Sequence, residues 1–239
     1  MPDTEWPAAR TPLWACFDAE WYVRQYPDVT VQFPEANAAE IETFYRETGR
    51  QLGHSPNCYF DEEWYRQAYP AVYKKICSGH LESAFAHYCH GGYADHSPHW
   101  LFDEAHYRHS HPSVSQVVLA DAGLLNGYDH FLSIGQDEFL SGHPFYDPEC
   151  AASLLRRLSV RPDENDCFGA CLRLDAAHAD SGRVSWLFDP VWYLKRYPHV
   201  GQDIAAGRFR SALHHYLTND TPRAFDPQEW FSESAYIAQ

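Results

Sequence analysis

The sequence is short of positive charge and lacks long apolar runs. Its 239 residues contain 18 Lys and Arg against 33 Asp and Glu, a formal net charge of −15 with histidine neutral. So acidic a chain is repelled by phosphate backbones and anionic lipid headgroups, which argues against nucleic-acid and membrane-surface partners. No apolar run reaches the roughly 18 residues of a transmembrane helix, and the first residues do not resemble a signal peptide. We therefore expect a cytoplasmic protein without a membrane span.

The sequence also lacks the motifs of a disulfide framework, a zinc ribbon or a common enzyme. Its seven cysteines are odd in number and irregularly spaced, and no two form a Cys-x-x-Cys pair. There is no nucleophile elbow, P-loop, dinucleotide fingerprint or HExxH motif. We therefore expect reduced thiols, no cofactor and no enzymatic activity.

Aromatic residues are abundant, at 16% of the chain, and many of them recur in phase. The pattern Phe-Asp-x-x-Trp-Tyr, followed by Tyr-Pro, begins at Phe17, Phe60 and Phe188, and a variant with His for Trp begins at Phe102. A degenerate copy begins at Tyr146 and has lost both the Trp-Tyr pair and the proline. The starts lie 42 to 44 residues apart, which indicates a tandem repeat.

The repeat predicts where the chain divides. The sixth start is placed at Phe231, because Phe225 lies only 37 residues after Phe188, whereas Tyr236 keeps the usual spacing from Phe231. The expected segments are an arm at 1–16, repeats at 17–59, 60–101, 102–145 and 188–230, a degenerate repeat at 146–187, and a partial repeat or cap at 231–239.

Each repeat carries the signals of roughly three short helices and none of a strand. The Asp after each Phe is a good N-cap, the Phe is placed for a hydrophobic staple, and the residue before the proline resists helical geometry. In the second repeat we expect a first helix ending at Tyr69, a second at 72–78 and a third at 81–90. The sequence thus predicts an all-α tandem array of units of about 42 residues, which bury one another's aromatic faces. The Trp-Tyr pairs are expected in that core rather than on a sugar-stacking surface.

The degenerate copy is the candidate recognition surface, because it breaks the phase of the buried aromatic residues. It also concentrates arginine in an otherwise acidic chain. Arginine pairs with carboxylates and phosphates and stacks on flat rings, so an acidic polysaccharide, a lipid-linked phosphosugar or an acidic patch of a neighbouring domain would suit it. The alternative is that these arginines pair with nearby Asp and Glu residues. The candidate binding residues are Arg156, Arg157, Arg161 and Arg173, with Arg183 close in sequence.

A histidine-rich segment offers an alternative, metal-binding site. Cys89, His90, His96 and His99 are of the types that bind Zn²⁺ or Ni²⁺ and lie at short, mixed spacings. Other histidines recur in phase and are better explained by structural hydrogen bonds; these are His87, His130 and His215. The recurring Asp residues are likewise explained by helix capping rather than by catalysis.

The repeat resembles one found in large bacterial proteins that carry glycosyltransferase domains for surface polysaccharide. The likeness rests on Phe-Asp-x-x-Trp-Tyr-x-x-x-Tyr-Pro-Asp-Val, as in Phe17–Val29, and on the later His-Tyr-Leu of His215–Leu217. It covers most of 17–239, and the copy at 146–187 departs from it. The resemblance implies a non-catalytic helical module that binds a glycan or a neighbouring glycosyltransferase domain. The alternatives are a stand-alone protein-interaction scaffold, a His/Cys metal-binding protein, and an enzyme whose site is assembled between repeats.

Overall fold

The computed structural model describes residues 10–162, 166–221 and 224–232, and the chain divides into two compact units. Unit 1 is Met1–Ser133 and unit 2 is Ile134–Gln239, so the boundary falls inside the third expected repeat. Across the described residues the regular structure is helical, with two isolated β-bridges and no strand. The all-α prediction is confirmed. In the same residues no helix is long and apolar enough to cross a membrane.

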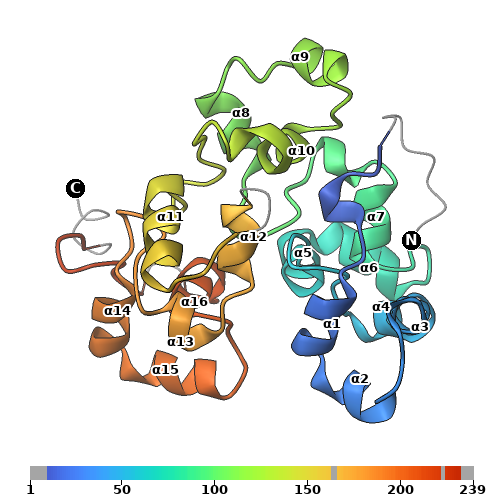
Figure 1. The fold of residues 1–239 in the computed structure, drawn as a ribbon, viewed down its shortest axis with the longest axis horizontal. Coiled ribbons are helices and arrows are strands. Elements are labelled where there is room, and N and C mark those ends of the chain that lie inside the picture. The colour runs from blue at the N-terminus through green and yellow to red at the C-terminus, as the bar shows by residue number, and fades with distance from the viewer. Residues whose placement is uncertain (1–9, 163–165, 222–223, 233–239) are drawn as a thin grey trace. The chain divides into compact units, whose positions relative to one another are not determined.

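Unit 1 is a succession of short helices joined by turns, which Figure 1 traces from α1 to α10. Helices α5, α6 and α7 pack on one another as a compact group. The helices are α1 (Ala19–Gln25), α2 (Pro27–Gln32), α3 (Ala38–Phe44), α4 (Arg50–Leu52), α5 (Glu62–Ala68), α6 (Pro70–Cys77), α7 (Ala84–Cys89), α8 (Glu104–Ser110), α9 (Gln116–Asp121) and α10 (Gly127–His130). Short 3-10 turns occupy Leu13–Ala15 and Gly92–Ala94, and π-helical turns follow α3 at Tyr45–Gly49 and α10 at Phe131–Gly135.

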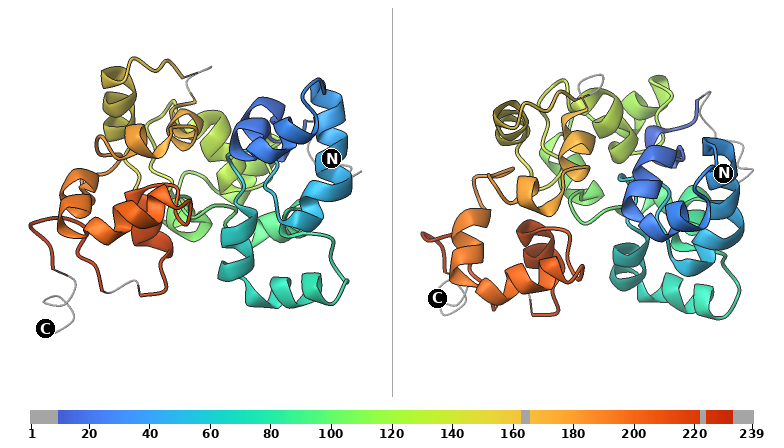
Figure 2. Two further views of the ribbon diagram at one scale, coloured as in Figure 1. Left: turned by 90° about the horizontal axis from the view of Figure 1, so that it is seen from below. Right: turned by 60° about the horizontal axis from the view of Figure 1, so that its bottom comes forward.

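Unit 2 has the same character. Helix α11 lies against α12, and α14, α15 and α16 pack together as a second compact group (Figures 1 and 2). The helices are α11 (Pro148–Arg157), α12 (Cys167–Leu172), α13 (Ala176–Ala179), α14 (Pro190–Arg196), α15 (Pro198–Ala205) and α16 (Ala212–Thr218).

An aspartate begins each of the five helices α1, α5, α8, α11 and α14. Its carboxylate accepts a hydrogen bond from the backbone N–H three residues on, at 2.8 to 3.0 Å. In α1, α5, α8 and α14 the preceding Phe packs on the Tyr of the first turn, with ring centroids 5.0 to 5.5 Å apart. These contacts are the N-cap and the hydrophobic staple, and both predictions are confirmed. The capping residues are Asp18, Asp61, Asp103, Asp147 and Asp189.

The second and third helices begin elsewhere than expected. Helix α6 begins at Pro70, two residues early, because Tyr69 leaves helical geometry and a proline is well tolerated at the first helical position. Helix α7 begins at Ala84, three residues late, because the Ser83 hydroxyl accepts from a backbone N–H and caps it there. In unit 2, α15 likewise begins at a proline, Pro198, and the Ser211 hydroxyl caps α16 just before Ala212.

Tyrosine, more than tryptophan, forms the recurring core. The expectation that the Trp of each pair is buried holds for Trp21 but is wrong for Trp64 and Trp192, which are half-buried. The Trp precedes the Tyr by one residue, so it lies about 100° around the helix and reaches the edge of the core instead of its centre. The tyrosines Tyr22, Tyr65, Tyr107 and Tyr193 are fully buried.

Each of these buried tyrosines bonds through its hydroxyl to a histidine. The oxygen lies 2.7 to 2.9 Å from a histidine Nδ1, in the pairs Tyr22–His54, Tyr65–His87, Tyr107–His130 and Tyr193–His215. The predicted structural role of the in-phase histidines is therefore confirmed. In the first copy Phe44 occupies the phased position, and His54 supplies the bond instead.

Candidate binding site

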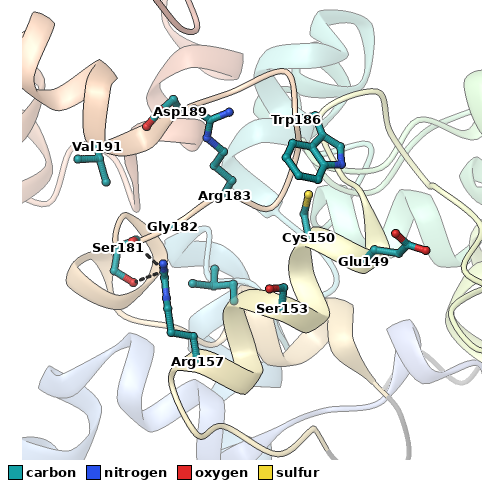
Figure 3. A pocket seen from close by; sticks show the side chains of 11 residues that line it. Glu149, Cys150, Ser153, Arg157, Ser181, Gly182, Arg183, Trp186, Asp189 and Val191 are labelled. Atoms are coloured by element: carbon teal, nitrogen blue, oxygen red, sulfur yellow. Dashed lines mark hydrogen bonds and ion pairs between the residues drawn. The ribbon is translucent and has the colours of Figure 1, made fainter.

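The degenerate segment forms a pocket of about 580 Å³ within unit 2. One wall is α11, and the other is the loop that runs from α13 to the start of α14 (Figure 3). The side chains that matter for its chemistry are Glu149, Cys150 and Arg157 of α11, Arg183 and Trp186 of the loop, and Asp189 at the start of α14.

Helix α11, which lines the pocket, departs from the repeat pattern of the sequence. Cys150 stands where the other copies have Trp or His, and Ala151 stands where they have the core Tyr. Without the Tyr-Pro break, the helix also continues to ten residues. Smaller side chains therefore stand at the start of α11, and Cys150 is one of the residues that line the pocket (Figure 3).

Trp186 is the aromatic residue among those that line the pocket, and 67% of its surface is accessible. The loop around it is held at fixed points: the Asp147 N–H donates to the Val184 carbonyl at 2.7 Å, and the Leu187 N–H donates to the Ser185 hydroxyl at 3.1 Å. The exposed indole presents an apolar face beside polar groups, and such faces stack on flat or weakly polar ligands.

The positive and negative charges of the side chains that line the pocket are equal in number. One Arg157 nitrogen donates to the Ser181 carbonyl at 2.7 Å, as drawn in Figure 3. Arg183 forms an ion pair with Asp189. Glu149 is exposed on the first turn of α11. Two guanidinium groups therefore share the pocket with two carboxylates.

Cys150 adds no charge to this pocket. Burial, helped by the neighbouring Asp147 carboxylate, raises the pKa of the Cys150 thiol to about 11. The thiol is therefore protonated near neutral pH, whereas a catalytic cysteine needs a lowered pKa. Its sulfur offers a small, weakly polar surface next to Trp186 (Figure 3).

The four arginines proposed from the sequence do not converge. Arg157 lines the Trp186 pocket, whereas Arg156 and Arg161 line a separate pocket of about 470 Å³. Arg173 pairs with Asp166 at 3.1 Å, and Asp166 also caps α12. Local pairing, the alternative raised from the sequence, thus describes Arg173 and Arg183.

The candidate metal ligands are dispersed among structural contacts. Cys89 is buried in α7, and the His90 ring bonds to the Ala86 carbonyl at 2.6 Å. His96 packs edge-on against Tyr69, while His99 is buried and accepts the Leu101 N–H. Among the described residues no group of three or more His, Cys, Asp and Glu side chains could hold a metal ion.

Sequence reasoning missed Trp186, Glu149 and Asp189 as members of one site. The available signal was a tryptophan outside the repeated motif, two residues before Phe188 and next to the copy that had lost its own Trp-Tyr pair. A comparison of the chain with protein-family models, with curated proteins and with solved structures gives no match. The site is therefore interpreted from its geometry and from the repeat pattern.

Proposed function

We propose that the chain is a non-catalytic, glycan-binding helical repeat module, of the kind that accompanies bacterial glycosyltransferases for surface polysaccharide. The observation that carries the proposal is the Trp186 pocket, where an exposed indole lies among hydrogen-bond donors and acceptors from α11 and the α13–α14 loop. Such a combination binds polyols, because the ring face covers the C–H surface of a sugar and the polar groups meet its hydroxyls.

We further propose that the helices form a tandem array of units of about 42 residues. Beyond the caps, staples and Tyr–His bonds, a backbone contact supports this: the capping Asp donates its N–H to the carbonyl of the proline that closes the same unit. The distances are 3.1 Å for Asp18–Pro56, 3.1 Å for Asp61–Pro98 and 3.0 Å for Asp189–Pro227. A new Phe follows four residues after each of these prolines, which supports Phe231 as the next start; Tyr236 lies outside the described residues.

A cytoplasmic location is part of the proposal. All seven cysteines are free thiols, as expected in a reducing compartment. The partners would be a glycan and a neighbouring glycosyltransferase domain.

A second candidate function is docking of a protein partner. Arg156 and Arg161 are exposed at their own pocket and form no ion pair with another described residue. Two guanidinium groups presented together suit an acidic patch on a partner domain.

A pair of charge reversals on one helix separates the two candidates. The purified chain is titrated with immobilised oligosaccharides and assayed for sugar transfer from nucleotide sugars. We expect binding without transfer, weakened about tenfold by Arg157→Glu and left unchanged by Arg156→Glu. Loss of partner-domain binding in Arg156→Glu, with no saccharide binding by the folded wild-type chain, would instead support the docking function.

A further inference from the structure

We infer that the ligand of the Trp186 pocket is an uncharged pyranoside, stacked on the indole, rather than an acidic or phosphorylated sugar. This inference rests on the glycan-binding function proposed above and narrows it. The sequence alone favoured an anionic ligand, because arginines concentrate in this segment. The structure shows how those arginines are already used.

The positive charge of the pocket is compensated. Arg183 is paired with Asp189, which leaves Arg157 as the guanidinium without a carboxylate partner among the described residues. Glu149 lines the same pocket, so an acidic ligand long enough to extend along the α11 wall from Arg157 meets this negative charge. The chain carries a formal charge of −15, which further disfavours an anion.

Glu149 and Arg157, which form no ion pair with another described residue, are placed to bind the hydroxyls of a sugar instead. Glu149 and Arg157 lie eight residues apart on α11, which separates them by about 12 Å along the helix. They are therefore too far apart to neutralise each other, and one offers acceptors where the other offers donors. A sugar hydroxyl can donate to a carboxylate and accept from a guanidinium, so an uncharged sugar uses both ends of the wall.

The shape of the pocket fits one or two sugar rings. Its volume of about 580 Å³ falls within the roughly 300–1,000 Å³ of small-molecule sites. Trp186 closes one side next to Cys150, while Glu149 and Arg157 lie toward opposite ends of the α11 wall (Figure 3).

The test compares uncharged hexose trisaccharides with trisaccharides that contain a uronic acid or a sugar phosphate, by calorimetric titration of the full chain at pH 7. We expect the uncharged trisaccharides to bind more tightly. Their affinity should change less than twofold between about 0.05 and 0.5 M salt, because an uncharged sugar forms no ion pair that salt could screen. Trp186→Ala should weaken binding at least tenfold, and Trp186→Tyr should restore most of it. Trp230→Ala is the matched control, since Trp230 is 85% exposed in the same unit and does not line the pocket.

Glu149→Gln gives a result of opposite sign for the two ligand classes. For an uncharged sugar the variant loses a strong acceptor and should bind several-fold more weakly, whereas for an anion it loses a repulsive charge and should bind more tightly. Tighter binding in Glu149→Gln, preference for the acidic trisaccharides, or full affinity in Trp186→Ala would overturn the inference and leave the glycan-binding function standing. If the wild-type chain binds no saccharide of either set, both fail.

Discussion

At the scale of single residues, four buried tyrosines each form a hydrogen bond between the hydroxyl and a histidine ring. Burial raises the pKa of Tyr193 and lowers the pKa of His215, so the phenol keeps its proton and the imidazole ring is uncharged. Burial acts in the same directions on Tyr65 and His87. Both groups of the hydrogen bond are therefore uncharged, and the core contains a satisfied polar pair without a buried charge.

Removing one such hydroxyl should destabilise the fold measurably. Tyr193→Phe keeps the ring but leaves Nδ1 of the buried His215 without its partner, at an expected cost of about 1–2 kcal/mol in the free energy of unfolding. Tyr73→Phe is the control, because Tyr73 is 46% exposed. Urea denaturation of the full chain measures both. Equal midpoints for the two variants would show that the bond contributes nothing.

At the scale of helices, carboxylates from elsewhere in the chain accept hydrogen bonds at the start of helices that are too short to be stable alone. Both oxygens of Glu62 accept from the first N–H groups of α7, at 2.8 Å each, and Glu104 does the same for α10 at 2.8 and 3.0 Å. In unit 2 the Asp180 carboxylate accepts from the first residue of α16 at 2.9 Å. A side chain from elsewhere in the chain thus shares the capping of each of these helices with its local N-cap residue.

Glu62 is fully buried and also pairs with Arg66 at 2.7 Å. Glu62→Ala would leave this guanidinium and two backbone N–H groups without their acceptor, and we expect a loss of about 3 kcal/mol or more. The neighbouring Glu63 is exposed on the same helix, so Glu63→Ala should stay within about 0.5 kcal/mol of wild type. Comparable thermal transitions for the two variants would contradict the capping role.

Asp180 should make unit 2 sensitive to pH. Burial raises the pKa of the Asp180 carboxyl to about 6 in the fold, from a usual value near 3.8. The protonated form is therefore favoured by folding: this contribution is fully present below about pH 4 and is lost as pH rises through 6. Asp180→Asn removes this pH dependence of the free energy of unfolding. The free energy of unfolding of the variant, relative to that of wild type, should therefore rise by roughly 2 kcal/mol between pH 4 and 7. The control is Asp137→Asn, at an exposed site. A difference in unfolding free energy between Asp180→Asn and wild type that stays constant from about pH 4 to 7, or that Asp137→Asn reproduces, would refute the role of Asp180.

At the scale of the whole molecule, the sequence predicted what is encoded locally. The Asp caps, the Phe–Tyr staples and the in-phase histidines all lie within a few residues of the helix that they serve or recur at a fixed interval, so they could be recognised from spacing. The pocket could not be recognised from spacing, because Glu149 and Arg157 line one pocket with Trp186 only when α11 packs beside a loop about 30 residues further on. The half-burial of Trp64 was missed for a related reason, since spacing gives the face of a helix but not how far the neighbouring elements cover it.

The structure of a saccharide complex tests the central claim most directly. Crystals of the full chain would be grown with an uncharged hexose trisaccharide and the position of the sugar determined. We predict a pyranose ring stacked on the Trp186 indole, with hydroxyls within hydrogen-bond distance of Glu149 and Arg157. A sugar bound elsewhere on the chain, with the Trp186 pocket filled by solvent, would contradict the account.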